Sequence, residues 1–252
     1  MPVAIVAAST WSLRRIIDRL GGDSSVLAIY HALYGVTTSS GNVTNWADAR
    51  GSSGFGPTLV GGASHLPTFD TTNNLVSFAA GQYATTAASS LFDVSVPISL
   101  IGVGIFPNAA GSPIFAEISE SASEVRHLAL FTSSPNSNKF AAETASTFIA
   151  ALSTAVGSTT ARRLAVASTD NSTNVNIDVP NQARVSTSIT GNTNASGNNQ
   201  LSLGAFFGAA ADANSSGGVN IRMVAVINQV VTAAQLTDLL NASTSDIGVV
   251  AA

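Results

Sequence analysis

The sequence predicts an all-β protein built as an antiparallel sandwich or jelly roll. Many segments alternate apolar and polar residues, as in 174–179 and 201–204, and glycine, asparagine, serine and threonine separate them. A period of two is typical of strands that bury one face, and regularly spaced turns join such strands into sandwiches. After Asp23 the helical period is largely lost. With 252 residues, 45% of them hydrophobic, the chain can bury a substantial core.

An N-terminal arm with a short helix, residues 1–25, precedes the predicted sandwich domain, 26–252. Ser9 or Thr10 can cap this helix, and Gly21 and Gly22 can end it. One interpretation is an ordinary amphipathic helix packed on the body. The other is a docking arm that inserts into a partner protein through an apolar stripe edged by arginine, formed by Val3, Ile5, Trp11, Leu13, Arg14, Arg15, Ile16, Ile17, Arg19 and Leu20. The apolar start is too short and lacks the basic flank for a secretory signal.

The predicted strands follow one another along the rest of the chain. They are 26–34, 75–78, 98–106, 114–118, 124–131, 162–167, 175–179, 184–189, 201–206 and 219–227. The segment 98–106 is nearly continuously apolar, which is typical of a strand buried on both faces. The alanine-, serine- and threonine-rich segment 141–160 fits a strand and irregular structure equally well.

A short C-terminal helix closes the predicted domain. Thr232 and Gln235 have the spacing of a capping box, in which each side chain bonds the other residue's backbone. Three leucines then supply an apolar face before Asn241. A strand, a tight turn and this helix form a compact closing unit.

Several short motifs stand in a familiar order. Trp-x-Asp-x-x-Gly spans 46–51, Pro-Thr lies at 67–68, Val-x-Phe at 76–78 precedes Tyr83, and the closing unit starts near 221. These motifs resemble the concanavalin A-like, or laminin-G-like, jelly rolls of bacterial surface proteins and bacteriophage virion proteins, over roughly 26–242. The chain departs from that pattern at 79–81, where Ala-Ala-Gly replaces the usual glycine. The resemblance implies a concanavalin A-like sandwich, a fold that hosts many functions.

The composition excludes several classes of protein. A net charge of −4 and a single lysine, Lys139, exclude a basic groove for nucleic acid and a polybasic membrane surface. No apolar run approaches the roughly 20 residues of a membrane span. The lack of cysteine excludes disulfides, a thiol nucleophile and cysteine-ligated metals.

No recognised catalytic set is visible, so the sequence predicts a protein that is not an enzyme and has no cofactor. Sandwich glycosidases use paired carboxylates, but Glu117 and Glu120 have the wrong spacing to share one strand face. No serine lies in Gly-x-Ser-x-Gly, and the glycine-rich segment 51–56 lacks the lysine of a phosphate-binding loop.

Metal binding is the remaining question of site chemistry. The three histidines, His31, His65 and His127, are isolated in sequence, which favours structural roles over a zinc site. The oxygen-rich loop pairs could bind Ca²⁺, although such residues more often shape turns; these pairs are Asp170 with Asn171 and Asp212 with Asn214.

Two functions fit these observations. The first is a non-catalytic structural protein of a bacteriophage virion, most concretely a homo-oligomeric capsid decoration (cement) protein that binds the major capsid protein and sister subunits. Few charges suit a surface buried against other subunits. The alternative is a carbohydrate-binding, lectin-like module of a tail fibre or cell-surface protein. Its site would use the loops 35–42, 133–138 and 190–199, with Trp46, Tyr30, Tyr34 and Tyr83 as a stacking platform. The place of Trp46 in the resembled motif favours packing in the core or at a sheet edge instead.

Overall fold

The computed structural model covers the whole chain and describes ten segments of it. These are 25–50, 56–62, 65–106, 113–120, 126–133, 139–144, 149–156, 160–189, 199–205 and 218–247. The predicted N-terminal helix and all ten candidate docking residues lie outside the described residues. The arm and the division into arm and sandwich domain therefore stay predictions.

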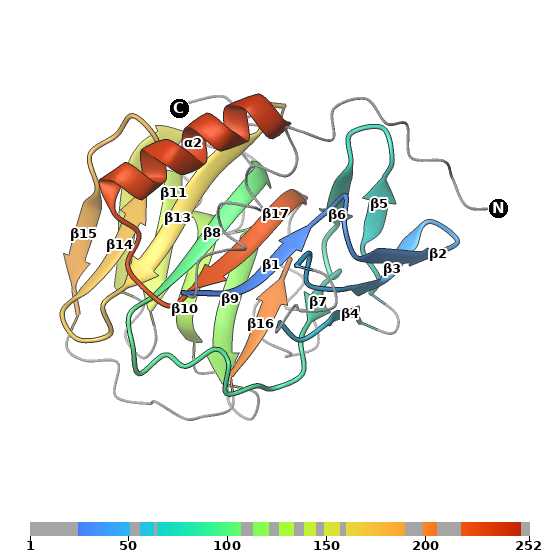
Figure 1. Cartoon of the computed structure of the whole chain (residues 1–252), viewed down its shortest axis with the longest axis horizontal. Coiled ribbons are helices and arrows are strands. Elements are labelled where there is room, and N and C mark those ends of the chain that lie inside the picture. Colours follow the sequence, from blue (N-terminus) through green and yellow to red (C-terminus); the bar gives the residue numbers. More distant parts are fainter. Residues whose placement is uncertain are drawn as a thin grey trace.

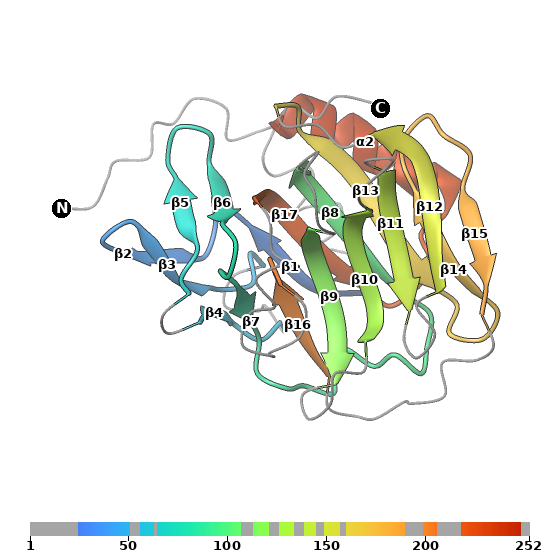
Figure 2. The same ribbon diagram turned by 180° about the vertical axis from the view of Figure 1, so that it is seen from behind.

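The described strands form an antiparallel sandwich of two sheets (Figures 1 and 2). In the first sheet the spatial order is β1 (Val26–His31), β17 (Val219–Ile227), β8 (Ile98–Ile105), β13 (Arg163–Thr169), β14 (Asn174–Asp178) and β15 (Val185–Ser188). In the second it is β7 (Ala84–Thr85), β16 (Asn199–Leu203), β9 (Ile114–Glu120), β10 (Arg126–Ser133), β11 (Lys139–Thr144) and β12 (Ile149–Val156).

Five short strands connect the two sheets at one side of the sandwich (Figure 1). They are β2 (Val36–Ser39), β3 (Asn42–Trp46), β4 (Leu59–Gly61), β5 (Thr68–Asp70) and β6 (Leu75–Phe78). Strand β6 pairs with β17 of the first sheet, and β4 pairs with β7 of the second. This side of the molecule brings β1, β6 and β17 together.

The inner faces of both sheets enclose a hydrophobic core that contains stacked aromatic rings. Phe106 stacks on Phe115, with ring centroids 4.2 Å apart, and meets Phe140 edge-on at 4.6 Å. Gly104 on β8 permits this packing, because a Cβ there would lie 2.2 Å from the carbonyl oxygen of Asn220 and 2.9 Å from the Phe115 ring. The sequence prediction that β8 is buried on both faces is confirmed, since every residue from Ile98 to Gly104 is buried.

The C-terminal helix α2 (Ala233–Ile247) lies across the outer face of the first sheet (Figure 1). Its predicted capping box is present: the Gln235 N–H donates to Thr232 Oγ1 at 3.2 Å, and the Thr232 N–H donates to Gln235 Oε1 at 2.8 Å. Leu236 and Leu239 pack on the sheet, as the apolar stripe predicts. The helix continues past Asn241 because the next glycine in the sequence is at 248. No described helix is long and apolar enough to cross a membrane.

The structure confirms an all-β antiparallel sandwich with one short C-terminal helix. Each of the ten predicted strand segments contains a strand. The segment 141–160, which the sequence left open, contributes to β11 and β12 at the far end of the second sheet.

Candidate ligand-binding site

The tryptophan motif at 46–51 belongs to the folded interior. Trp46 is fully buried, donates from Nε1 to the carbonyl of His31 at 3.2 Å, and meets the buried Tyr30 edge-on. Tyr83 lies elsewhere, stacked on His65 with ring centroids 5.9 Å apart. Core packing of Trp46 is therefore confirmed, and the predicted four-ring sugar platform is wrong.

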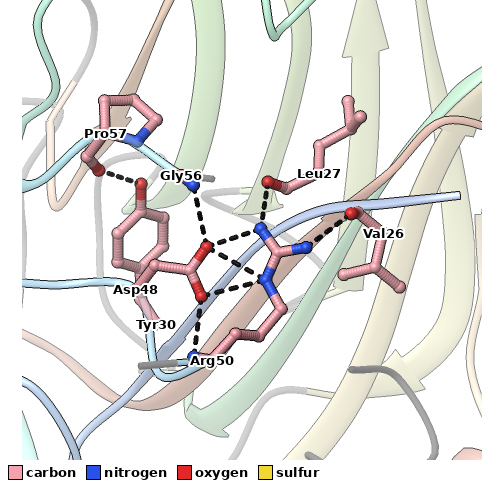
Figure 3. A network of polar contacts seen from close by, with 7 residues as sticks. All are labelled: Val26, Leu27, Tyr30, Asp48, Arg50, Gly56 and Pro57. Atoms are coloured by element: carbon pink, nitrogen blue, oxygen red, sulfur yellow. Dashed lines mark hydrogen bonds and ion pairs between the residues drawn. The ribbon is translucent and has the colours of Figure 1, made fainter. Parts of the chain in front are cut away.

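Asp48 and Arg50 complete this motif as a structural clamp (Figure 3). Arg50 donates from Nη1 and Nη2 to the carbonyls of Val26 and Leu27 on β1, and it forms an ion pair with Asp48, Nη2 to Oδ2, at 2.6 Å. Asp48 also accepts from the Gly56 N–H at 3.0 Å. The clamp fixes the start of β1 to the chain that follows β3.

Tyr30 provides a second contact of this kind. Its hydroxyl donates to the carbonyl of Pro57 (Figure 3). Burial and the nearby Asp48 carboxylate raise the pKa of Tyr30 well above its ordinary value, so the phenol stays protonated and able to donate. The contacts of Val26, Leu27 and Tyr30 hold β1 in place, and they thereby also fix where the strand ends.

A polar cluster lies where β1 ends. The chain turns tightly after His31, because the Tyr34 N–H donates to the His31 carbonyl at 2.8 Å. The ring centroids of His31 and Tyr34 are 5.3 Å apart. The Ala32 N–H donates to the carbonyl of Arg222 at 2.8 Å and ties this turn to β17. The pairing of β17 with β8 shifts register between Ile221 and Met223, which places Arg222 at an irregular point of the strand.

Two arginines converge on one turn beside Tyr34. Arg222 donates from Nη1 to the carbonyl of Asn74 at 2.7 Å, and Arg162 donates from Nη2 to the carbonyl of Asn73 at 2.8 Å. These neighbouring carbonyls belong to the turn between β5 and β6. We call His31, Tyr34, Arg162, Arg222 and the turn 71–74 the Arg222 site. Arg222 is 4% exposed, Tyr34 and Arg162 are half-buried, and residues 71–73 are exposed, so the site reaches the surface.

In this site the charge of Arg162 acts on Arg222, and that of Arg222 acts on His31. Burial and the neighbouring charge of Arg162 lower the pKa of Arg222 to about 10. Tyr34 has the opposite effect and raises this pKa. Arg222 therefore remains charged at neutral pH. Burial and the Arg222 charge lower the pKa of His31 to about 3, so its ring is neutral there, and His31 Nδ1 accepts from the Leu33 N–H at 3.2 Å. An aromatic ring and two planar cations thus share one small region.

One carboxylate that acts on this region is Asp70, at the end of β5. Its two oxygens accept from the Thr72 N–H and from the backbone and side-chain amides of Asn73, at 2.7 to 3.0 Å. These Asn73 bonds, with the charge of Arg162, hold the pKa of Asp70 below its usual value. Asp70 thus shapes the turn, and the charge that acts on it is that of Arg162.

Carboxylates also gather on the outer face of the second sheet. Glu117 on β9 and Glu143 on β11 both pair with Ala129 on β10, so these side chains share one face, and Ser202 on β16 continues the row. Sequence reasoning compared glutamates within one strand and missed this assembly from neighbouring strands. Glu117 and Glu143 are 1% and 7% exposed and have further contacts within the chain, so these carboxylates are buried although they lie on the outer face of the sheet.

In the Asp170 loop, one of the predicted Ca²⁺ positions, the Asp170 carboxylate accepts hydrogen bonds from its own loop. Asp170 Oδ1 accepts from the N–H groups of Ser172, Thr173 and Asn174, and Oδ2 accepts from Thr173 Oγ1. Partial burial alone would raise the pKa of Asp170, but these hydrogen bonds outweigh it and lower the pKa well below its ordinary value. Asp212 and Asn214 lie outside the described residues, within which no group of three or more acidic or histidine side chains could hold a metal.

Sequence reasoning missed the arginines of the Arg222 site although a signal was present. Arg222 is the one charged residue of β17, whose other residues are apolar apart from Asn220. Its partner, the Asn74 carbonyl, lies 148 residues earlier in the chain, so no local spacing could reveal the contact. Of the predicted rim loops, 35–42 forms the exposed hairpin β2–β3 directly after Tyr34. Residues 134–138 and 190–198 lie outside the described residues.

Comparison with known proteins finds likeness only at the level of structure. No family model and no curated protein matches the sequence. Trypanosoma rangeli sialidase matches with a TM-score of 0.61 and 12% identity, over 90% of this chain and 34% of the sialidase chain. The binding domain of botulinum neurotoxin serotype C1 matches with a TM-score of 0.56 and 9% identity, over 86% of this chain and 52% of the other. The chain thus spans about a third of the sialidase and about half of the toxin domain.

These neighbours correct one sequence prediction. The expectation that the chain is not an enzyme is contradicted, because sialidases share its fold. That expectation relied on the lack of a carboxylate pair within one strand and did not consider neighbouring strands, where Glu117 and Glu143 share one face on either side of Ala129. At this identity the likeness carries the fold alone. Together, the strand order and these neighbours show a jelly-roll-like antiparallel β-sandwich, which is consistent with the predicted concanavalin A-like fold.

Proposed function

We propose that this chain is a carbohydrate-binding, lectin-like module and that the sugar binds at the Arg222 site. The fold supports this proposal, since its structural neighbours include sialidases in complex with sialic acid and toxin binding domains. The observation that carries it is the half-buried ring of Tyr34 beside Arg162 and Arg222.

The chemistry of these groups matches that of a sugar. A sugar offers hydroxyl oxygens around its rim and an apolar face of C–H groups. Guanidinium groups present several N–H donors in a fixed plane, and a tyrosine ring offers an apolar surface with a polar tip. The exposed hydroxyl and amide side chains of residues 71–73 provide further hydrogen-bonding groups at the edge.

Glycan-array binding by the full chain tests the proposal, followed by titration of the best ligand. We expect Tyr34→Ala to weaken binding about tenfold, which corresponds to the loss of one aromatic contact. Tyr83→Ala is the matched control, because Tyr83 is also half-buried but stacks on His65 away from the site. Failure of the wild-type chain to bind any glycan, or equal losses in both variants, would contradict the proposal.

Attachment to a virion is a second, separate proposal. The apolar stripe edged by Arg14, Arg15 and Arg19 supports it, since such a stripe suits contact with the major capsid protein or a sister subunit. Deleting residues 1–20 should abolish oligomers in sedimentation experiments and particle association, while glycan binding persists. Unchanged association after this deletion would contradict the docking role of the arm.

A further inference from the structure

Arg222 is a buried cation with most of its hydrogen-bonding capacity unused. A guanidinium has five N–H donors. Among the residues that the structure describes, Arg222 makes one side-chain hydrogen bond, to the carbonyl of Asn74, and its buried Nε has no partner. It forms no ion pair with a carboxylate of the described segments; the charge that acts on it there is the second cation, Arg162.

Other arginines of this protein show how the fold satisfies such a group. Arg184 forms a two-pronged pair with Asp178, at 2.8 and 2.9 Å, and also donates to the carbonyl of Val231. Arg50 has both its carboxylate, Asp48, and two strand carbonyls. Arg222 is more buried than either side chain, yet no carboxylate of the described segments pairs with it as Asp178 and Asp48 pair with these two.

This arrangement is unfavourable for a purely structural residue. Burying a charge without a counter-ion is costly, and a like charge nearby raises that cost. The neutral ring of His31 offers no compensation, and both oxygens of Asp70 accept bonds from their own turn. A negative group from outside the chain would supply what is missing.

We infer that Arg222 and Arg162 receive an anionic oxygen group of the bound sugar, a carboxylate or a sulfate, so that the ligand is an acidic glycan. This inference rests on the proposed function and names the chemical class of its ligand. The planar guanidinium matches both groups, because two parallel N–H donors can meet two oxygens. Tyr34, beside the same cation, then contacts the sugar ring that carries the group.

Paired oligosaccharides test the inference with the full chain. One pair is a uronic-acid oligosaccharide and its carboxyl-reduced form; the other is a sulfated oligosaccharide and its desulfated form. We expect one acidic member to bind about tenfold more tightly than its neutral counterpart, the effect of a charge-assisted hydrogen bond. The pair that shows the preference distinguishes carboxylate from sulfate.

The variants assign that preference to the site. Arg222→Gln should abolish it, and Arg162→Gln should reduce it. Lys139→Gln is the matched control, because it removes one positive charge from the second sheet and should leave the preference unchanged. Thermal unfolding verifies folding; should Arg222→Gln not fold, Arg222→Lys keeps the charge but loses the planar pair of donors, so its preference should fall several-fold.

The outcomes separate this inference from the proposed function. Equal binding of acidic and neutral members overturns the inference, while glycan binding itself survives. A preference that persists in folded Arg222→Gln, or that Lys139→Gln removes equally, also overturns it. If the wild-type chain binds no oligosaccharide at all, both fail.

Discussion

Arg50 and Arg222 both lie beside β1, yet the protein treats their charges in opposite ways. Arg50, at the start of the strand, has a carboxylate and two carbonyls as partners, supplied by residues that close the clamp (Figure 3). Arg222, at the other end, has one carbonyl and a neighbouring cation. The first arrangement is complete within the chain and stabilises the fold. The second gains from an external anion, which is typical of a binding site.

The two regions also differ in how far their partners lie along the chain. Asp48 and Arg50 are two residues apart, so the Trp-x-Asp motif was visible in the sequence even though its clamp was not. The Arg222 contact joins residues 148 positions apart and depends on how β6 and β17 pair. Short sequence motifs here predict parts of the scaffold, whereas the Arg222 site depends on how distant strands pair.

The most disruptive test of the comparison is Asp48→Ala. This variant leaves the Arg50 charge buried without its partner, so we expect a loss of about 3 kcal/mol in the free energy of unfolding. Asp93→Ala, which removes an exposed carboxylate bonded to one backbone N–H, should cost about 1 kcal/mol or less. Urea denaturation measures both. Similar losses in the two variants would contradict the structural role of the clamp.

The pH dependence of stability is the next largest effect. The pKa of His31 is held at about 3 in the folded chain, against about 6.5 when unfolded, so protonation favours unfolding. His31 therefore stabilises the fold fully above about pH 6.5, and this contribution is lost as the pH falls toward 3. Between pH 6 and 4, wild type should lose about 2 kcal/mol more than His31→Gln.

Two further variants make this pH test specific. Arg222→Gln should weaken the same dependence, since the Arg222 charge contributes to the lowered pKa of His31. His65→Gln serves as the control, because His65 is only half-buried, and it should follow the wild-type curve. Parallel curves for wild type and His31→Gln would show that His31 is not buried beside a cation.

The smallest effect is expected from Arg222→Met. Removing a buried charge that has no counter-ion among the described residues should change the free energy of unfolding by about 1 kcal/mol or less, and it can stabilise the chain. Arg50→Met, the matched variant, leaves Asp48 uncompensated and should cost about 3 kcal/mol. If Arg222→Met lost as much free energy of unfolding as Arg50→Met, then Arg222 would be a structural residue like Arg50.

Particular elements show what the sequence could and could not predict. Strand β14, strand β8 and the cap of α2 at Thr232 were predictable from the sequence. Their signals are alternating apolar and polar residues, a continuous apolar run and a capping box, and each of these extends over only a few residues. Strands β11 and β12 were not, since small alanine, serine and threonine side chains give little contrast between faces. The Glu117 row and the Arg222 site require strand register, which no single segment encodes.

The most direct test of the proposed site is a two-dimensional NMR titration of the full chain with the tightest acidic oligosaccharide. We expect the largest shift changes at 31–35, 71–75, 160–163 and 221–223, which form and flank the Arg222 site. Residues of β9–β11 around Glu117 should change little. Shifts concentrated on the second sheet, with the Arg222 site unaffected, would contradict the account.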